Sequence, residues 1–289
     1  YFGSGNEAHW IYNFSLPRIL VYSILSGDSS YIEKLTMSMP PSQLGTAYLN
    51  FIASHDGIGL RPAESFLSQN EIEKFINHME KNGGKISYRS NNTNTPEPYE
   101  INISLMDAMK ESFDKESKLY LKRFICVHTI MLSLEGVPAI YIHSLFGSSN
   151  DYDLFKITKQ NRSLNRGKIK VSEIMKSDHP NEHHTIFNEI KNLIKIRKKQ
   201  PAFNPNAVQF TLHLGRDLYG IWRQSLDKTQ SIFCITNLTH NDTILSLLDL
   251  NLTSFDSWHD LLSNISIDED SKDLLLKPYQ TVWLSNLKN

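Results

Sequence analysis

The sequence has few cysteines, no excess of one charge and no long apolar run. Cys126 and Cys234 are its only cysteines, and both lie in apolar segments, so we expect buried thiols rather than a disulfide framework. The 30 Lys and Arg residues nearly balance the 31 Asp and Glu residues, which leaves a net charge of -1. This balance gives no electrostatic footprint for nucleic acid, and we expect no nucleic-acid partner.

No apolar run approaches the roughly 18 residues that a membrane-spanning helix needs, and none has the pattern of a signal peptide. We therefore expect a cytoplasmic protein without a membrane partner. The chain opens on Tyr1, without Met and already in loop-like sequence, so we interpret it as a piece of something longer. Its 289 residues are enough for one large domain and a small one.

One stretch organises the chain. Residues 49–54 (LNFIAS) form an apolar run of strand length, which stops on the pair His55 and Asp56 and continues into a glycine-containing loop. A strand of a parallel barrel delivers catalytic groups in this way, with polar residues at its carboxyl end. We predict that Asp56 lies in an active site with His55 beside it. The alternatives are an aspartate that closes an Asx turn and a structural histidine.

The first 201 residues alternate between strand-like and helix-like segments, which indicates α/β architecture with a parallel sheet. Residues 61–114 are too irregular and too long for a simple connection, so we expect an inserted subdomain there. The expected strands are 8–14, 49–54, 85–90 and 137–142, with a further strand-like segment at 99–109. The expected helices are 17–27, 29–39, 69–81, 115–134 and 182–199.

After Pro201 the pattern changes to short β-type runs separated by turns. The expected strands are 208–214, 218–224, 230–238 and 279–284, and we predict an antiparallel all-β domain over residues 202–289. Trp222, Trp258 and Trp283 could form a platform for a sugar. Each lies in an apolar run, however, so we favour packing in the core.

Four segments together resemble a known enzyme family: residues 12–17 (YNFSLP), 53–62 (ASHDGIGLRP), 147–151 (GSSND) and 161–166 (NRSLNR). They are similar to the carboxyl-terminal part of sugar phosphorylases of glycoside hydrolase family 13, the α-amylase family. Within this family the segments resemble sucrose phosphorylase and its relatives, and residues 53–62 and 161–166 are more similar to glucosylglycerate phosphorylases. The resemblance implies strands six to eight of a (β/α)₈ barrel, an inserted subdomain and a terminal β-sandwich.

The resemblance also implies roles for individual residues. Asp56 matches the transition-state stabiliser, which binds the 2- and 3-hydroxyls of the sugar, and His55 would bind the same sugar. Hydroxyl contacts of this kind tighten in an oxocarbenium-like transition state. Arg162, Asn165 and Arg166 match a loop near the acceptor and phosphate, and Arg197 would correspond to an arginine that contacts the sugar or the phosphate. An arginine fork suits phosphate, but arginines of a solvated loop are the alternative.

The implied reaction is retaining transfer of glucose from a glucoside to inorganic phosphate, without metal or organic cofactor. Nothing in the sequence matches the family's nucleophile or general acid/base, so we expect the chain to require an N-terminal barrel half. We expect it neither to fold stably nor to act alone, because three barrel strands leave open edges. The alternatives are an α-amylase-type hydrolase or transglucosidase, and a non-catalytic carbohydrate-binding remnant.

We interpret two further groups of residues as parts of a solvent-exposed surface. Glu182 lies near His179, His183 and His184, but their spacing matches no metal-ligand motif. The basic residues between positions 191 and 199 are typical of an exposed helix face.

Overall fold

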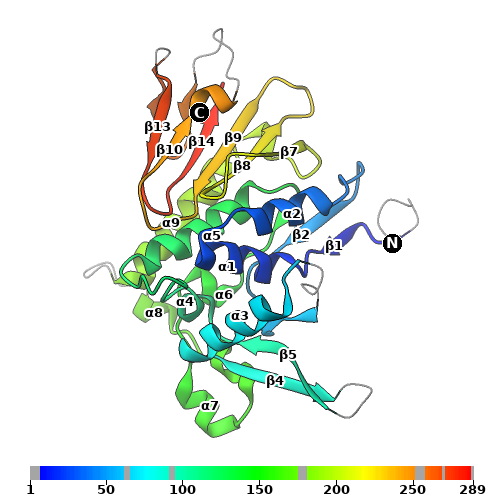
Figure 1. Cartoon of the computed structure of the whole chain (residues 1–289), viewed down its shortest axis with the longest axis vertical. Helices are drawn as coiled ribbons and strands as arrows, with labels where there is room; N and C mark the ends of the chain where they lie inside the picture. Colours follow the sequence, from blue (N-terminus) through cyan, green and yellow to red (C-terminus); the bar gives the residue numbers. More distant parts are fainter. Residues whose placement is uncertain are drawn as a thin grey trace.

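The structure, a computed structural model, describes residues 7–61, 66–90, 95–174, 181–250, 258–268 and 271–287. Strands from the end of the chain lie at one end of the long axis, helices occupy the middle, and β4 (Lys85–Ser90) and β5 (Pro96–Asn102) lie towards the other end (Figure 1). Within the described ranges, no helix has the length and apolarity needed to cross a membrane.

Three parallel strands form the first sheet, in the order β1 (Trp10–Tyr12), β2 (Ala47–Asn50) and β6 (Val137–Pro138). β2 ends at Asn50, four positions before the predicted end at residue 54. The pairing of β2 with β6 ends where Asn50 stands opposite Pro138. Residues 51–57 therefore leave the sheet as a loop, and the predicted strand 137–142 is wrong beyond Pro138.

Side-chain hydrogen bonds join the ends of these strands. Asn50 Nδ2 donates to the Glu135 carbonyl at 2.7 Å, and Asn50 Oδ1 accepts from Asn13 Nδ2 at 3.1 Å. The Asn50 carbonyl accepts from the Ala139 amide at 2.7 Å. These bonds connect residues next to all three strands, so the loop that follows β2 starts from a fixed point.

Helices pack beside this sheet, and two of them show how local sequence sets their ends. α1 (Leu16–Ser26) has Pro17 in its first turn and stops at Gly27, whose φ of 68° is left-handed, as predicted. α5 (Tyr120–Ser133) begins later than the predicted start at residue 115. Lys115 has a φ of 63°, which a right-handed helix cannot contain. The other helices of this part are α2 (Ser30–Ser38), α6 (Ile142–Leu145), α7 (Tyr152–Thr158), η2 (Asn161–Asn165), α8 (Val171–Ile174), α9 (Glu182–Arg197) and η3 (Pro201–Phe203).

The segment predicted as an insertion forms a small antiparallel sheet in the order β3-β5-β4, in which β3 is Ile58–Gly59. The predicted helix at 69–81 is confirmed as α3 (Gln69–Lys81). It starts with a capping box, in which Ser68 and Glu71 satisfy each other's backbone amides. The sheet is followed by α4 (Leu105–Ala108). β3 directly follows the His55 and Asp56 loop, so this sheet lies next to the candidate site.

The final part is a six-stranded antiparallel sheet with an additional strand pair, β10 with β13. The four predicted runs are present as β7, β8, β9 and β14. Trp283 is fully buried and Trp258 is 8% exposed, which confirms the prediction of core packing for both. Cys126 and Cys234 are buried and unpaired. The elements are β7 (Val208–Leu212), β8 (Leu218–Gln224), β9 (Ser231–Asn237), β10 (Thr243–Ser246), η4 (Leu247–Leu250), β11 (His259–Asp260), β12 (Ile265–Ser266), β13 (Asp273–Leu276) and β14 (Thr281–Ser285).

Candidate functional site

The loop after β2 carries the candidate site. Ser54 Oγ accepts from the Asp56 amide at 3.1 Å, which turns the loop at the aspartate. Gly57 follows, and a β-carbon at this position would come within 2.4 Å of the Ile101 carbonyl. Because only glycine fits so close to β5, the residue after Asp56 fixes how near the loop lies to the inserted sheet.

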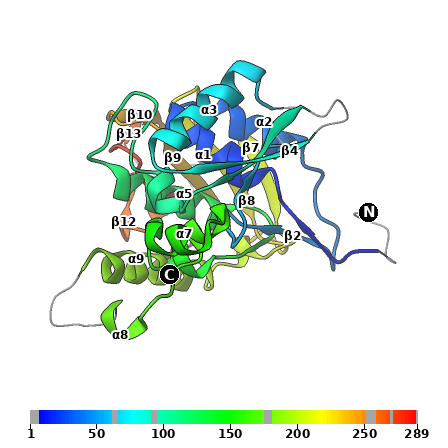
Figure 2. The same cartoon turned by 90° about the horizontal axis from the view of Figure 1, so that it is seen from below.

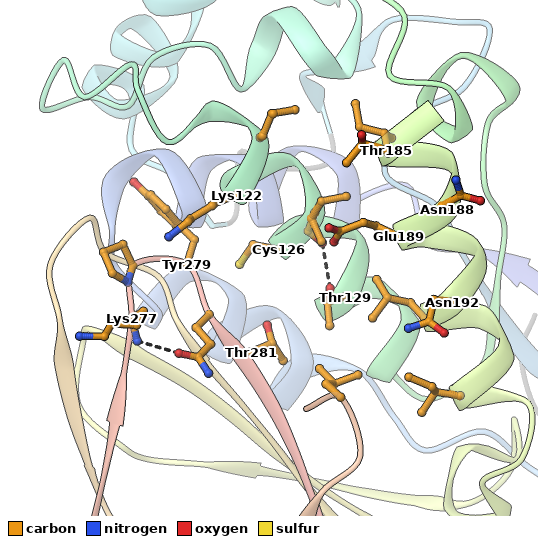
Figure 3. Close-up of a pocket in the computed structure, with 18 residues that line it drawn as sticks. Lys122, Cys126, Thr129, Thr185, Asn188, Glu189, Asn192, Lys277, Tyr279 and Thr281 are labelled. Carbon is orange, nitrogen blue, oxygen red and sulfur yellow. Dashed lines mark hydrogen bonds between the residues drawn. The ribbon is translucent and has the colours of Figure 1, made fainter. Parts of the chain in front are cut away.

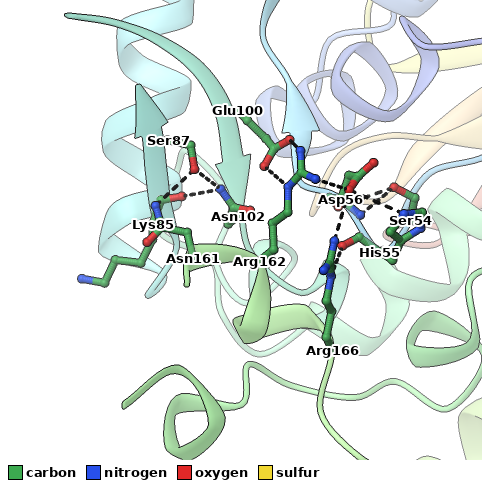
Figure 4. A network of polar contacts seen from close by, with 10 residues as sticks. All are labelled: Ser54, His55, Asp56, Lys85, Ser87, Glu100, Asn102, Asn161, Arg162 and Arg166. Atoms are coloured by element: carbon green, nitrogen blue, oxygen red, sulfur yellow. Dashed lines mark hydrogen bonds and ion pairs between the residues drawn. The ribbon is translucent and has the colours of Figure 1, made fainter. Parts of the chain in front are cut away.

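Asp56 lies between two arginines (Figure 4). Its Oδ1 is 2.7 Å from Arg162 Nη1 and 3.3 Å from Arg166 Nη2. His55 Nε2 is 3.6 Å from the same oxygen, and the His55 side chain is 69% exposed. The Asp56 side chain is 40% exposed, so a ligand can still reach it.

Arg162 also binds a second acid, Glu100 of β5. Arg162 Nε donates to Glu100 Oε1 at 3.0 Å, and Nη2 donates to Oε2 at 2.7 Å. These hydrogen bonds are the main reason that the pKa of Arg162 is raised above its ordinary value. Sequence analysis missed Glu100. The sequence signal for Glu100 was a carboxylate within the strand-like segment 99–109. A buried carboxylate in a strand needs a charged or hydrogen-bonding partner, because burying it alone costs free energy.

Asn165 and Arg166 hold the backbone of the loop. Asn165 Nδ2 donates to the Ser54 carbonyl at 2.7 Å, and Arg166 Nε donates to the His55 carbonyl at 2.7 Å. Tyr141 Oη donates to the Asn165 carbonyl at 2.7 Å. Burial raises the pKa of Tyr141, so its hydroxyl remains a donor near neutral pH. The structure thus brings together five of the six predicted residues.

Arg197 is the sixth predicted residue, and the structure places it in a different environment. Its Nε donates to the Leu132 carbonyl at 2.7 Å, and Nη2 donates to the carbonyls of Gly136 and Phe203 at 3.2 and 3.1 Å. Burial lowers its pKa to about 10. In this position Arg197 connects the end of α9 to α5, to the segment before β6 and to η3.

The histidine-rich segment makes local contacts. Glu182 Oε2 accepts from Tyr120 Oη at 2.9 Å, His183 Nδ1 lies 2.6 Å from the Phe146 carbonyl, and His184 lies in the first turn of α9. His179 lies outside the described residues. Among the residues that the structure describes, no three His, Cys, Asp or Glu side chains form a group suited to a metal ion.

Two cavities differ in their chemistry. A small one of about 160 Å³ adjoins the site, and Asp56, Glu100 and Asn165 contribute to its lining. A larger cleft of about 720 Å³ lies between α5, α9 and residues 277–281 (Figure 3). Glu189 is the only carboxylate among the described residues that line the larger cleft. We place the candidate site at the smaller cavity, because charged groups converge there.

Comparison with solved structures identifies the class of fold. Sucrose 6F-phosphate phosphorylase from Thermoanaerobacter thermosaccharolyticum superimposes with a TM-score of 0.68 at 17% identity, covering 93% of this chain and 47% of that one. An α-amylase from Geobacillus thermoleovorans gives a TM-score of 0.58 at 12% identity, covering 96% of this chain and 47% of that one. The fold is therefore that of part of an α-amylase-type enzyme.

Sequence comparison identifies a smaller group of similar enzymes within this fold. The chain is 33% identical to glucosylglycerate phosphorylase of Escherichia coli and 31% identical to that of Spirochaeta thermophila, over 98% and 99% of its length. It spans about half the length of these curated relatives, 50% of each. No protein-family model matches it. The resemblance to sugar phosphorylases of glycoside hydrolase family 13, with glucosylglycerate phosphorylases among them, is confirmed.

Proposed function

We propose that residues 1–289 form the sugar-binding wall of a glycoside phosphorylase active site. The observation that carries this proposal is the half-exposed carboxylate of Asp56, held by two arginines in the loop that follows a parallel strand. It occurs in a chain whose relatives are glucosylglycerate phosphorylases. The proposed reaction transfers glucose from a glucoside such as glucosylglycerate to phosphate and yields glucose 1-phosphate with retained configuration.

The geometry of Asp56 supports a role in the transition state. Among the described residues, its ion pairs all fall on Oδ1, which leaves Oδ2 for hydroxyls of the sugar ring. Hydrogen bonds from ring hydroxyls to a fixed carboxylate strengthen as positive charge develops at the anomeric carbon. Because Arg162 and Arg166 hold Oδ1, the carboxylate is oriented before the sugar arrives.

A retaining reaction needs a nucleophile and a general acid/base, with their carboxyl groups about 5 Å apart. Glu100 is joined to Asp56 through Arg162, but both of its oxygens accept hydrogen bonds from that arginine. It is therefore poorly placed to attack a sugar or to donate a proton. We propose that both carboxylates come from a segment outside residues 1–289.

The exposed aromatic side chains of β1 and its position at the edge of the sheet support a further segment that packs against this strand. β1 is an edge strand of the parallel sheet and lies at one side of the molecule in both views (Figures 1 and 2). Trp10 and Tyr12 are 54% and 58% exposed, and nearby Phe14 is 61% exposed. An edge strand with exposed aromatic side chains is normally covered by another segment or another chain. We propose that the preceding half of a barrel pairs with it, making residues 1–201 the end of that barrel, with the insertion at 61–114, and 202–289 a β-sandwich.

The decisive test is a phosphorolysis assay on the full-length protein that contains this chain. We expect glucose 1-phosphate to appear from glucosylglycerate or sucrose only when inorganic phosphate is present. Release of free glucose at the same rate without phosphate would identify a hydrolase instead. Absence of turnover with both substrates, in a folded protein that still binds them, would support a carbohydrate-binding remnant.

A further inference from the structure

Glu100 is an acid in an unusual place. It lies in the central strand of the inserted sheet, opposite Gly59 of β3 and Ser87 of β4. Its side chain is 6% exposed. Burial of a charge is costly unless the charge is paired and hydrogen-bonded. The two hydrogen bonds from Arg162 meet that requirement with the parallel geometry that an arginine fork prefers.

Glu100 also contacts the candidate loop by packing. A β-carbon on Gly57 would come within 2.6 Å of Glu100 Cγ, so the methylene groups of Glu100 lie against the residue that follows Asp56. The inserted sheet therefore contacts the Asp56 loop in two ways. Glu100 binds Arg162, which pairs with Asp56, and its methylene groups pack against the backbone at Gly57.

The planar guanidinium group of Arg162 determines which of its nitrogens faces Asp56. A guanidinium group is planar and rigid, so fixing two of its nitrogens fixes the third. Glu100 holds Nε and Nη2, and the remaining nitrogen, Nη1, lies 2.7 Å from Asp56 Oδ1. In Figure 4 the guanidinium lies between the two carboxylates. Without Glu100, Arg162 would be free to rotate towards solvent or towards an anionic ligand.

We propose that Glu100 is a positioning residue that orients Arg162 against Asp56 and so couples the inserted subdomain to sugar binding in the transition state. This inference rests on the proposed function. It assigns Arg162 to the orientation of Asp56 rather than to the capture of phosphate, because its charge is already matched by two acids. Arg166, which pairs with one acid among the described residues, is then the better placed of the two arginines for an anion.

The test is a double-mutant cycle in the full-length protein, using Glu100→Gln, Arg162→Lys and the double variant. Glu97→Gln is the matched control, because Glu97 lies on the same strand but is 48% exposed and pairs with Arg89 at 3.4 Å. Each variant is assayed for kcat, for the KM of the glucoside, phosphate and released acceptor, and for its melting temperature. We expect Glu100→Gln to lower kcat about tenfold to a hundredfold, as loss of a hydrogen bond to a charged group does.

The cycle separates positioning from other roles. We expect the double variant to be no slower than Arg162→Lys alone, since Glu100 acts through that arginine. Additive losses, or a change confined to the acceptor KM, would overturn the proposal, the latter by placing Glu100 in contact with the acceptor. If Glu100→Gln does not fold, Arg162→Lys decides alone, and wild-type kcat in that variant overturns the proposal. A normal kcat in Asp56→Asn would instead contradict the proposed function itself.

Discussion

Arg162 Nη1 lies 2.7 Å from Asp56 Oδ1, although the two residues come from segments separated by the whole inserted subdomain. Three residues further along, Asn165 holds the Ser54 carbonyl at 2.7 Å. The short helix η2 thus fixes both the side chain and the backbone of the Asp56 loop. Two segments that the sequence keeps far apart form one site.

Replacing Asp56 tests the centre of this site. In the full-length protein we expect Asp56→Asn to lower kcat about a thousandfold, because the neutral amide loses about 4 kcal/mol of transition-state stabilisation. The melting temperature should change little. Asp153→Asn is the control, since Asp153 is 90% exposed and pairs with Lys156 on its own helix. Near-normal turnover of Asp56→Asn would show that this aspartate does not bind the reacting sugar.

Gly57 tests how closely the loop must approach β5. We expect Gly57→Ala to destabilise the fold by about 1–3 kcal/mol, because the new methyl group overlaps the Ile101 carbonyl. We also expect kcat/KM to fall by up to about a hundredfold, since the loop moves with Asp56. Gly45→Ala is the control, because Gly45 has a φ of 86° but open space around it. That variant should lose stability without losing activity, and equal activity losses in both variants would contradict the role of the loop.

Arg197 distinguishes a structural arginine from a phosphate ligand. We expect Arg197→Met to lower the free energy of unfolding by about 2 kcal/mol, because the carbonyls of Leu132, Gly136 and Phe203 lose their donor. The KM for phosphate should remain unchanged. Chemical denaturation and phosphate titration measure the two effects separately. A large rise in the phosphate KM with wild-type stability would restore the role expected from the sequence.

His128 gives the fold a dependence on pH. It is fully buried in α5, its Nδ1 lies 2.7 Å from the Phe124 carbonyl, and burial lowers its pKa to about 4. Between about pH 4 and pH 6.5 the unfolded chain binds a proton that the folded chain does not. The free energy of unfolding should therefore fall as the pH falls through this range, by at most about 3 kcal/mol from this residue.

The measurement is denaturant unfolding at several pH values for the wild-type protein and for His128→Leu. We expect a shallower pH dependence in the variant. Part of the dependence should remain, because burial also lowers the pKa values of His78 and His143. Parallel curves for the two proteins would show that His128 is not the group responsible.

Local sequence was sufficient to predict a helix when the residues that start and stop it lie within or next to that helix. The helix over 69–81 has its capping box within four residues, and α1 has both its proline start and its glycine stop. The ends of the parallel strands could not be predicted in this way. β2 stops at Asn50, where its pairing with β6 ends opposite Pro138, a residue distant in the chain. A strand end of this kind depends on a partner that no local pattern specifies.

For the site, the sequence by itself determined which residue types were available: Asp56 and His55 after a strand, and arginines in the segment 161–166. Tertiary structure decided which of them meet. It brought Arg162 and Arg166 to Asp56, and it directed Arg197 to backbone carbonyls instead. It also paired Glu100 with Arg162, which lies far from it in the sequence. Charge pairing in a folded protein depends on distance and burial, and both are set by packing between segments remote in the chain.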